Sequence, residues 1–445
     1  MTRAHRRRRF ATIIAATASS LGLAAITAQQ APAAVSCDRV AAPSGSDSAV
    51  GTEQLPLKSA QALVTSLASG QTGCLRGGTY SQDQVKIATP GVTLASFPGE
   101  RAKLVGRLWI ANGANRVTVE GLNLDGRNSR NLPSPTVNAS DSVFRDNDVT
   151  NGHTAICFNL GHPSYGRADR TTIASNRIHD CGALPATNHH HGIYVALAND
   201  TIIRGNVIYG NADRGIQLYP SSQGARITNN VIDGNGEGII FGGNSSSASS
   251  NNVVENNLIT NSTLRYNVES SWDGPVGRGN VVRNNCIRGG VRDTGNGGIQ
   301  SPRVGFTATG NLLTDPGYAN RGAGDFTLVA DSPCAKILAG ASPTSTPPAT
   351  TTATSTSPVR LSLASHKRKA ERGQRVKLTG HASNLRTVEI EVKRNHVWRH
   401  VRRDRVRHNR FRVGVRALRS GVVRYRAKAI GSTKTTRAVL IKVVR

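Results

Sequence analysis

The side chains with the greatest capacity for chemistry lie between residues 188 and 301 of a 445-residue chain. They begin with three consecutive histidines in Asn188-His189-His190-His191-Gly192, after which tyrosine, arginine and glutamate side chains recur. Imidazole, carboxyl, phenol and guanidinium groups are those that proton transfer and the stabilisation of charge require. The candidate catalytic residues are His190, His191, Tyr194, Arg214, Glu237 and Glu269. The candidate substrate contacts are Gln217, Tyr219, Arg265, Trp272 and Gln300.

Two reactions would use such a set of side chains. Elimination from a uronic acid needs a cation to neutralise the carboxylate, a base to remove the ring proton, and an acid for the leaving oxygen, and arginine, histidine and tyrosine suit these roles. Hydrolysis of a glycosidic bond needs two carboxyl groups at a defined separation, for which Glu237 and Glu269 are the obvious pair. The plainer interpretation of each residue is a solvated side chain on an outer face.

The histidine string is the most unusual of these features. In an extended strand His190 would point to the same side as Tyr194, and His189 and His191 to the opposite side. One strand therefore presents at most two of the three imidazoles to a metal ion, so we predict no metal site. A base, a substrate contact and an ordinary loop remain as interpretations of this string.

These residues lie within a repeat that must position them. An Asn-x-hydrophobic pattern returns at intervals of 24 to 30 residues, and a Gly-Ile-x-hydrophobic pattern follows it in most repeats. Short alternating strands at this period predict a solenoid whose coils stack by parallel strand pairing, roughly 4.8 Å apart. The residues expected to face inward are Ile193, Ile216, Ile239, Val268 and Ile299. Those expected to share one outer face are Tyr194, Gln217, Ile240, Glu269 and Gln300.

The repeated asparagine has a structural explanation. Asparagine tolerates left-handed bends, and stacked asparagine side chains can hydrogen-bond from one coil to the next. We therefore exclude this column from the candidate site residues. Its members are Asn147, Asn176, Asn206, Asn230, Asn257, Asn285 and Asn311.

With this repeat, residues from about 50 to 340 resemble right-handed parallel β-helix proteins of the pectate-lyase-like type. An amphipathic segment at Ser59–Leu67 resembles their N-terminal cap helix, and Asp315-Pro316 with the segment Gly324–Leu328 resembles their last coils. The resemblance implies an all-β chain with a right-handed parallel β-helix of about ten coils. It implies no single function, because such proteins include lyases, hydrolases, epimerases and non-catalytic binding proteins. The acidic motifs of polygalacturonase-like hydrolases and the Asp-Pro-His string of alginate-epimerase-like proteins are absent from the sequence.

The ends of the chain and its cysteines indicate export. Residues 1–33 read as a secretory signal peptide, with an arginine-rich start, an apolar stretch and an Ala-x-Ala cleavage site. All six cysteines lie beyond it, as expected in an oxidising compartment. Six cysteines allow fifteen connectivities, and the spacing favours Cys37–Cys74, Cys157–Cys181 and Cys286–Cys334. We expect a secreted protein that is extracellular or associated with the cell wall.

The charge is concentrated at one end of the chain. Residues 341–358 form a Ser/Thr/Pro-rich linker, and residues 359–445 hold 26 of the 56 Lys and Arg residues but only four of the 27 acids. Period-two alternation over 359–445 predicts a small β-sandwich that resembles immunoglobulin-like modules. The resulting domains are 34–340 for the β-helix and 359–445 for the basic module. A net charge of +22 on so small a module predicts attraction to polyanions; the plainer alternative is a merely soluble basic module.

These observations favour a secreted β-helix protein that engages polysaccharide, with a lyase acting on acidic, uronate-containing glycans as the enzymatic interpretation. The alternative is a non-catalytic glycan-binding or surface adhesion protein. The expected partners are a polysaccharide or a cell-wall polyanion, with no specific nucleic acid and no membrane span, and a monomer is expected. No cofactor is expected; calcium occurs in some such proteins, but no clustered aspartate ladder indicates it here.

Overall fold

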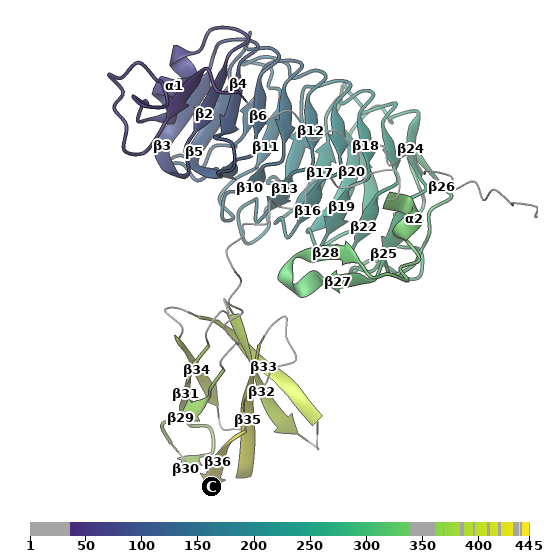
Figure 1. Cartoon of the computed structure of the whole chain (residues 1–445). Coiled ribbons are helices and arrows are strands. Elements are labelled where there is room, and N and C mark those ends of the chain that lie inside the picture. Colours follow the sequence, from purple (N-terminus) through teal and green to yellow (C-terminus); the bar gives the residue numbers. More distant parts are fainter. Residues whose placement is uncertain are drawn as a thin grey trace, which may run out of the picture. The chain divides into compact units, whose positions relative to one another are not determined.

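The computed structural model describes residues 36–338 and, nearer the C-terminus, 361–367, 369–382, 387–394, 397–406, 410–416, 420–429, 436 and 438–444. The predicted signal peptide (1–33) and linker (341–358) lie outside these residues. Residues 36–338 form a parallel β-helix of about nine turns, close to the expected ten (Figure 1). Within the described residues, no helix reaches the length and apolar character of a membrane span.

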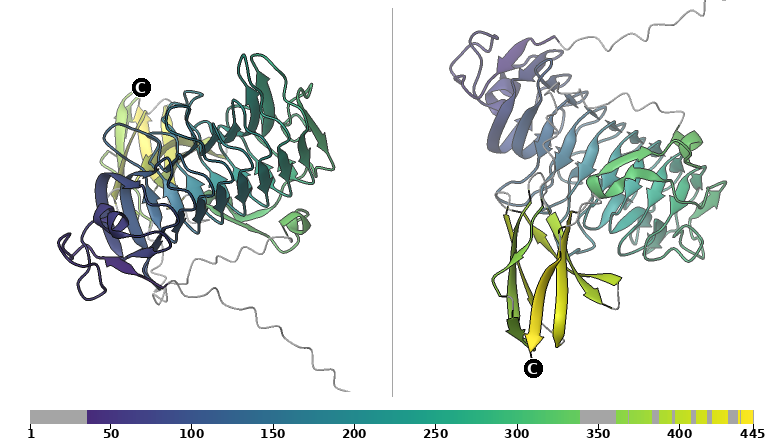
Figure 2. Two further views of the ribbon diagram at one scale, coloured as in Figure 1. Left: turned by 90° about the horizontal axis from the view of Figure 1, so that it is seen from above. Right: turned by 60° about the horizontal axis from the view of Figure 1, so that its bottom comes forward.

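Each of the six central coils, from β6–β8 to β21–β23, contributes a strand to each of three faces, and the successive coils can be followed in Figure 2. The first face is an eleven-stranded sheet of β1 (Arg39–Ala41), β2 (Thr72–Leu75), β4 (Thr93–Ser96), β6 (Thr118–Glu120), β9 (Val143–Arg145), β12 (Thr172–Ala174), β15 (Ile202–Arg204), β18 (Arg226–Thr228), β21 (Val253–Glu255), β24 (Asn280–Arg283) and β26 (Phe306–Thr309). The second consists of β7 (Asn123–Asp125), β10 (Asp148–Thr150), β13 (Arg177–His179), β16 (Val207–Tyr209), β19 (Val231–Asp233), β22 (Leu258–Thr260) and β25 (Cys286–Arg288). The third consists of β8 (Thr136–Val137), β11 (Phe158–Leu160), β14 (Ile193–Val195), β17 (Arg214–Leu218), β20 (Glu237–Gly243) and β23 (Val268–Trp272).

The second and third faces are joined through the first coils. The long strand β3 (Gly78–Ile87) pairs with β5 (Ala102–Ile110), which pairs with β7 at one end and with β8 at the other. Strand β5 bends at Gly106, whose φ is +128° and where a Cβ would overlap the carbonyl of Gln82. Glycine is therefore required at this bend. Helix α1 (Ala60–Ser66) caps this end of the coil stack, and its N-cap Ser59 accepts a hydrogen bond from the Ala62 N–H, as N-cap serines commonly do.

The core is the narrow column of apolar side chains that the alternation predicts. All five residues expected to face inward are buried, from 0% exposed for Ile193 to 7% for Ile299. They belong to one continuous cluster that runs from Ala41 to Phe306. Because each coil adds only one layer to this column, the coils depend on their neighbours for burial.

The asparagine column forms the predicted ladder at the corner between the first and second faces. Each side-chain amide from Asn147 to Asn285 donates to the side-chain oxygen of the next member, at 2.9–3.0 Å. The left-handed residue of each bend is not the ladder asparagine but the residue before it, as at Asn229 and Asn256 (both φ +57°). The ladder asparagines therefore connect successive coils by hydrogen bonds, and the residue before each of them adopts the left-handed conformation of the bend.

Three disulfides close the β-helix with the predicted pairing. Their Cα–Cα separations are 5.6 Å for Cys37–Cys74, 5.6 Å for Cys157–Cys181 and 6.0 Å for Cys286–Cys334. These separations lie within the ordinary range for disulfides. The last bridge holds the C-terminal return of the β-helix, which consists of β27 (Tyr318–Asn320), η1 (Arg321–Ala323), β28 (Asp325–Leu328) and α2 (Ala335–Leu338). Phe326 and Cys334 pack on Val231 and Leu258, so this return covers part of the second face.

The C-terminal part contains two small sheets. One is three-stranded, with β29 (Ala364–Ser365), β31 (Arg375–His381) and β34 (Arg410–Arg416). The other is five-stranded, with β30 (Lys369–Glu371), β36 (Val439–Val444), β35 (Gly421–Ala429), β32 (Thr387–Arg394) and β33 (Val397–Arg405). Residues of both sheets share one core, which includes Leu378, Ile390 and Phe411. A β-structured basic module is thus present, and its immunoglobulin-like nature stays a prediction.

Candidate functional site

A glycine bend in the slot of Gly192, Gly215 and Gly238 decides which side chains of β14, β17 and β20 reach the outer surface of the third face. A Cβ on Gly215 would lie 3.0 Å from the Ile232 side chain inside the coil, and the next residue, Ile216, is also fully buried. Two successive residues therefore face inward, and the alternation slips by one position. Arg214 consequently emerges on the same side as Gln217, with Nη1 3.4 Å from the Gln217 Oε1.

The same slip corrects the expected direction of His191. An unbroken extended strand would turn His191 away from Tyr194, but their rings meet edge to face at 5.6 Å. Gly192, which follows His191, occupies the slot of Gly215, where the alternation changes. His191 therefore lies on the outer side of the strand, although it is only 2% exposed.

The predicted outer row is present in the strand register. Tyr194 pairs with Gln217, Gln217 with Ile240, and Ile240 with Glu269. A bridge between Val268 and Ile299 places Gln300 one coil beyond Glu269. Stacking thus brings residues of five successive coils onto one surface.

Arg214 is held below that surface. Its guanidinium donates to the Asn188 carbonyl at 3.0 Å and to the Asn188 side-chain oxygen at 2.7 Å, and its Nε lies 3.0 Å from the Glu237 Oε2 without hydrogen-bond geometry. The side chains of Arg214 and Glu237 are only 5% and 2% exposed. Arg214 therefore positions the 188–190 loop and Glu237.

Asp213 is a site residue that the sequence analysis missed. Its carboxylate accepts hydrogen bonds from the N–H groups of Asn188, at 2.8 Å, and His190, at 2.9 Å. Asp213 and Arg214 together hold the histidine string from the next coil. The only sequence signal for this role is the acidic residue directly before the candidate arginine.

The two histidines at the site differ in what they can do. The His190 Nδ1 accepts the Ala183 N–H at 3.1 Å, so a neutral His190 ring carries its proton on Nε2 and acts as a donor there. Burial, together with the positive charge of Arg214, lowers the pKa of His191, which is therefore neutral. The His191 Nδ1 has no hydrogen-bond partner among the described residues.

Two carboxyl groups meet in the next coils. Burial raises the pKa of Glu237, the Arg214 charge opposes this, and the Glu269 carboxylate raises the pKa further, since a neighbouring like charge disfavours ionisation. Neither Glu237 carboxyl oxygen has a hydrogen-bond partner among the described residues, and the raised pKa favours the protonated form of this buried carboxyl. Arg265, which is 46% exposed, lies 3.6 Å from the Glu269 Oε1. Both carboxyl groups are therefore buried, Glu269 (8% exposed) slightly less than Glu237 (2%), and the Arg265 cation lies beside Glu269.

The aromatic and amide candidates differ in how far they are buried and in whether hydrogen bonds hold their side chains in place. Burial raises the pKa of Tyr194 to about 12, so its phenol stays protonated. Tyr219 is partly exposed and lies over Gly242 of the next coil. The Trp272 Nε1 donates to the Val304 carbonyl at 3.0 Å, and Gln300 accepts from the Ser270 N–H at 2.8 Å. Trp272 and Gln300 are therefore fixed by hydrogen bonds to the backbone of the β-helix.

Coil spacing divides the candidate set into two groups. Tyr194 and Glu269 are three strand steps apart in the register. At the usual spacing of parallel strands this is a separation of about 14 Å. They cannot act on the same bond. One group lies around Tyr194, Arg214 and Gln217, and the other around Glu237 and Glu269.

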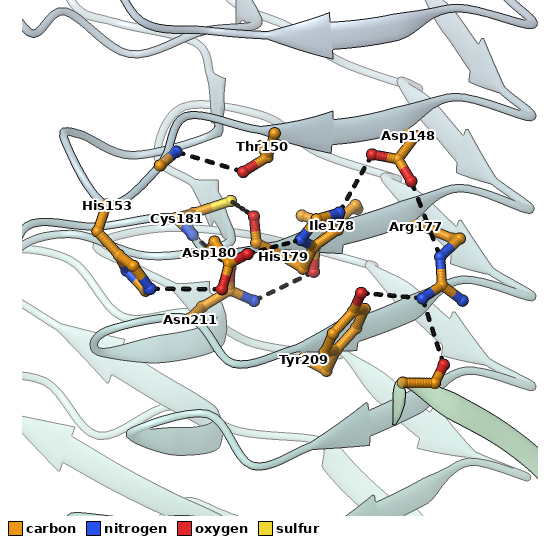
Figure 3. A network of polar contacts seen from close by, with 12 residues as sticks. Asp148, Thr150, His153, Arg177, Ile178, His179, Asp180, Cys181, Tyr209 and Asn211 are labelled. Atoms are coloured by element: carbon orange, nitrogen blue, oxygen red, sulfur yellow. Dashed lines mark hydrogen bonds and ion pairs between the residues drawn. The ribbon is translucent and has the colours of Figure 1, made fainter. Parts of the chain in front are cut away.

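A second polar cluster, on the second face, was also missed (Figure 3). The His179 Nε2 lies 3.1 Å from the Asp148 Oδ1, and its Nδ1 lies 3.0 Å from the Asp180 Oδ2. The ring stacks on Tyr209 at 5.0 Å, and Arg177 donates to the Tyr209 hydroxyl at 2.9 Å. Both ring nitrogens of His179 are occupied, so this cluster ties coils together and offers no free base.

The His179 network predicts a loss of stability at alkaline pH. Burial opposes the charged ring, but hydrogen bonds to Asp148 and Asp180 outweigh it and raise the pKa of His179 from 6.5 to about 9. A raised folded-state pKa contributes stability below the unfolded value, and this contribution is lost as the pH rises through the folded value. The free energy of unfolding should therefore fall by up to about 3 kcal/mol between about pH 6 and pH 10.

Urea unfolding of the native chain and of His179→Gln at both pH values measures this effect. The variant should lose most of the alkaline decrease and be less stable than the native chain near pH 6. An equal alkaline decrease in both proteins would show that another group is responsible.

Comparison with known proteins agrees with the coil architecture. A family model described as right handed beta helix region matches residues 136–300. The coils therefore form a right-handed β-helix, as the sequence resemblance implied. No curated protein sequence matches the chain.

Several solved structures are similar in outline. Pectate lyase Pel9A has 14% identity and a TM-score of 0.49, over 67% of this chain and 91% of that one. The complex of XylC with xylose has 12% identity and a TM-score of 0.40, over 56% and 69%. A rhamnogalacturonan lyase has 12% identity and a TM-score of 0.29, over 62% and 87%. Similarities this low leave the reaction and the substrate open.

Proposed function

We propose that the third face of the β-helix binds an acidic polysaccharide and that the protein is secreted. The observation that carries the proposal is the row of stacked outer side chains from Tyr194 through Gln217 to Glu269, with the exposed Arg265 beside it. One outer position per coil, with a phenol, an amide and a carboxylate on three of these four coils and the Arg265 guanidinium beside the last, suits a ligand that itself repeats along its length. The three disulfides support export.

The reaction that this face supports best is elimination from a uronic acid at Arg265 and Glu269. Arg265 is exposed enough to neutralise the sugar carboxylate, which makes the adjacent ring proton easier to remove. Glu269 would remove that ring proton. The bond to the leaving oxygen would break as the double bond forms, and the leaving oxygen would take up a proton from water. The proposed roles of Glu237 and Arg214 are to position and polarise Glu269 from below.

Hydrolysis by the same two carboxyl groups is less well supported. Retaining and inverting glycosidases separate their carboxyl groups by about 5 Å or more, so that a sugar carbon or a water fits between them. Glu237 and Glu269 instead lie close enough together for the Glu269 carboxylate to raise the pKa of Glu237. Their side chains are only 2% and 8% exposed, which leaves little room for a sugar between them.

Non-catalytic glycan binding is the second candidate function. The observation that favours it is the burial of Arg214, which is occupied by Asn188, Gln217 and Glu237 and has little surface left for a substrate. Under this alternative the face would bind the polymer without altering it. The residues around Tyr194 would then be the main contacts.

A panel of polymers distinguishes the two functions. The full chain is incubated with several uronate polymers and with neutral polymers, and ultraviolet absorbance of unsaturated ends and reducing sugars are followed. We expect unsaturated ends from a uronate polymer only. Retained binding without product would support the binding protein, and reducing ends without ultraviolet absorbance would indicate hydrolysis.

The basic C-terminal module is proposed to anchor the protein on a polyanion. The exposed side chains of Arg402, Arg403 and Arg405 on β33 and of Arg410 and Arg412 on β34 support this role. Residues 359–445 carry a net charge of +22 out of +29 for the whole chain. Attraction of this kind is screened by salt.

A chain that ends at residue 358 should lose retention on an anionic polymer. Pull-down of the full and shortened chains on immobilised polyuronate, at low and high salt, measures the difference. The full chain should be retained at low salt and released at high salt, and the shortened chain should be retained much less. Equal retention of both chains would contradict the anchoring role.

A further inference from the structure

The outer row of the third face continues beyond the candidate site toward the N-terminal coils. Tyr194 pairs with Asn159, Asn159 with Thr136, and Thr136 with Trp109. Trp109 in turn pairs with Lys86 of β3. The row therefore reaches a tryptophan three coil steps, about 14 Å, from Tyr194 and six steps, about 29 Å, from Glu269.

Trp109 is held in a fixed orientation and lies beside two cations. Its Nε1 donates to the Asn138 side-chain oxygen at 2.9 Å, and Asn138 is 1% exposed. The Lys86 Nζ lies 4.8 Å from the centroid of the ring and the Arg107 guanidinium carbon 4.9 Å. Tyr165, which is 54% exposed, meets the ring edge to face at 6.3 Å. An anchored aromatic ring with a polar rim is a surface on which a sugar ring can stack.

Arg107 lacks the acidic partner that other arginines of the β-helix have. Arg101 and Arg283 pair with carboxylates at 3.4 and 2.8 Å, whereas no described residue forms an ion pair with Arg107. Its neutral partners are Gln84, whose Oε1 accepts Nη1 at 3.0 Å, and Thr136, whose Oγ1 lies 3.4 Å from Nε and Nη2. Guanidinium donors remain unused in this arrangement.

The surroundings disfavour the charge of Arg107. Partial burial, and then the positive charge of Arg130, lower the pKa of Arg107. Lys86 adds a further positive charge beside Trp109. A half-buried cation among cations is stabilised when an anion binds beside it.

We infer that Lys86, Arg107 and Trp109 form a subsite for an anionic sugar residue, a carboxylate or a sulfate, of the polysaccharide that the third face binds. The inference rests on the proposed function of that face. It predicts how the polysaccharide lies on the face and how long it must be. An anionic sugar residue binds at the N-terminal coils, and the bond acted on lies near Glu269. A chain that occupies both places spans about 29 Å, so short oligosaccharides cannot gain from both.

Local fluorescence separates this subsite from the basic C-terminal module. The chain has three tryptophans, and replacing Trp272 and Trp398 by phenylalanine leaves Trp109 as the only indole reporter. The probes are an oligouronate, a sulfated oligosaccharide and a neutral oligosaccharide of equal length. We expect the Trp109 emission to change with an anionic probe and to change little with the neutral one, and the stronger of the two anionic probes identifies the group that is bound.

Charge-removing variants in this background provide the decisive comparison. Lys86→Gln/Arg107→Gln should weaken the anionic probe at least about tenfold, the equivalent of one charge-assisted contact. The matched control Arg204→Gln/Arg226→Gln removes two exposed charges from the first face and should change affinity less than about twofold. The single variant Lys86→Gln alters only an exposed side chain and should show a smaller loss in the same direction.

The outcomes separate the subsite from the function of the face. If the anionic probe binds Lys86→Gln/Arg107→Gln as tightly as it binds the protein with both residues intact, and the polymer still binds, the subsite is overturned. The proposed function of the face would still stand. Equal losses in the test and control variants would also overturn it. Absence of any binding to the β-helix by uronate and sulfated probes would overturn both.

Discussion

Replacement of Asn257 by alanine is expected to lower the free energy of unfolding by about 3–5 kcal/mol, because it removes one member of the asparagine ladder. Asn257 is fully buried, and its amide donates to the Ile227 carbonyl at 2.8 Å and to the Asn285 side chain at 2.9 Å. Its oxygen accepts both the backbone and the side-chain N–H of Asn230 at 2.9 Å. Alanine would leave these partners unsatisfied in the interior of the coil stack, where water cannot replace them.

The control for this variant is Asn320→Ala. Asn320 is exposed, and its side chain makes no capping hydrogen bond. Urea denaturation followed by circular dichroism should show a large decrease of the unfolding midpoint for Asn257→Ala and little change for Asn320→Ala. Similar midpoints for the two variants would contradict the structural role of the ladder.

Replacement of Glu269 by glutamine should lower the rate of elimination by about 10²–10⁴-fold, the usual contribution of a general base. Glutamine keeps the size and shape of the side chain, so the local packing is preserved, but its amide cannot remove a proton from the substrate. Affinity for the polymer should change much less than the rate. The rate is measured from the ultraviolet absorbance of unsaturated ends and the affinity from titration of the inactive variant.

Glu255→Gln is the matched control for this prediction. Glu255 pairs with Arg283 at 2.8 Å on the first face, as Glu269 pairs with Arg265 on the third. The control should retain the native rate. Equal rates for Glu269→Gln and Glu255→Gln would remove Glu269 from the reaction, and a loss of affinity equal to the loss of rate would assign it to binding.

The coil architecture was predictable because each of its determinants is local and repeated. The Asn-x-hydrophobic and Gly-Ile patterns set the register, so the inward positions of Ile193 and Ile216 and the outer row of Tyr194 and Gln217 follow from alternation. The cysteine pairing follows the same stacking, since Cys157 and Cys181 lie in successive coils.

The finer features of the site depend on backbone geometry that alternation does not encode. The slip at the glycine bends turned His191 and Arg214 to the outer side, and contacts with Asn188 and Glu237 hold Arg214 below the surface. The role of Asp213 requires the 188–190 loop to fold back onto the next coil, a tertiary contact with no local signal. The His179 network likewise forms only when three coils are stacked.

The most direct test of the proposed function is a crystal structure of Glu269→Gln with a bound uronate oligosaccharide. We expect the sugar to lie on the third face, along β14, β17, β20 and β23, with a uronate carboxylate beside Arg265 and its ring proton directed at residue 269. An oligosaccharide bound only on the first face, or only on the C-terminal sheets, would contradict the assignment of this face as the polysaccharide site.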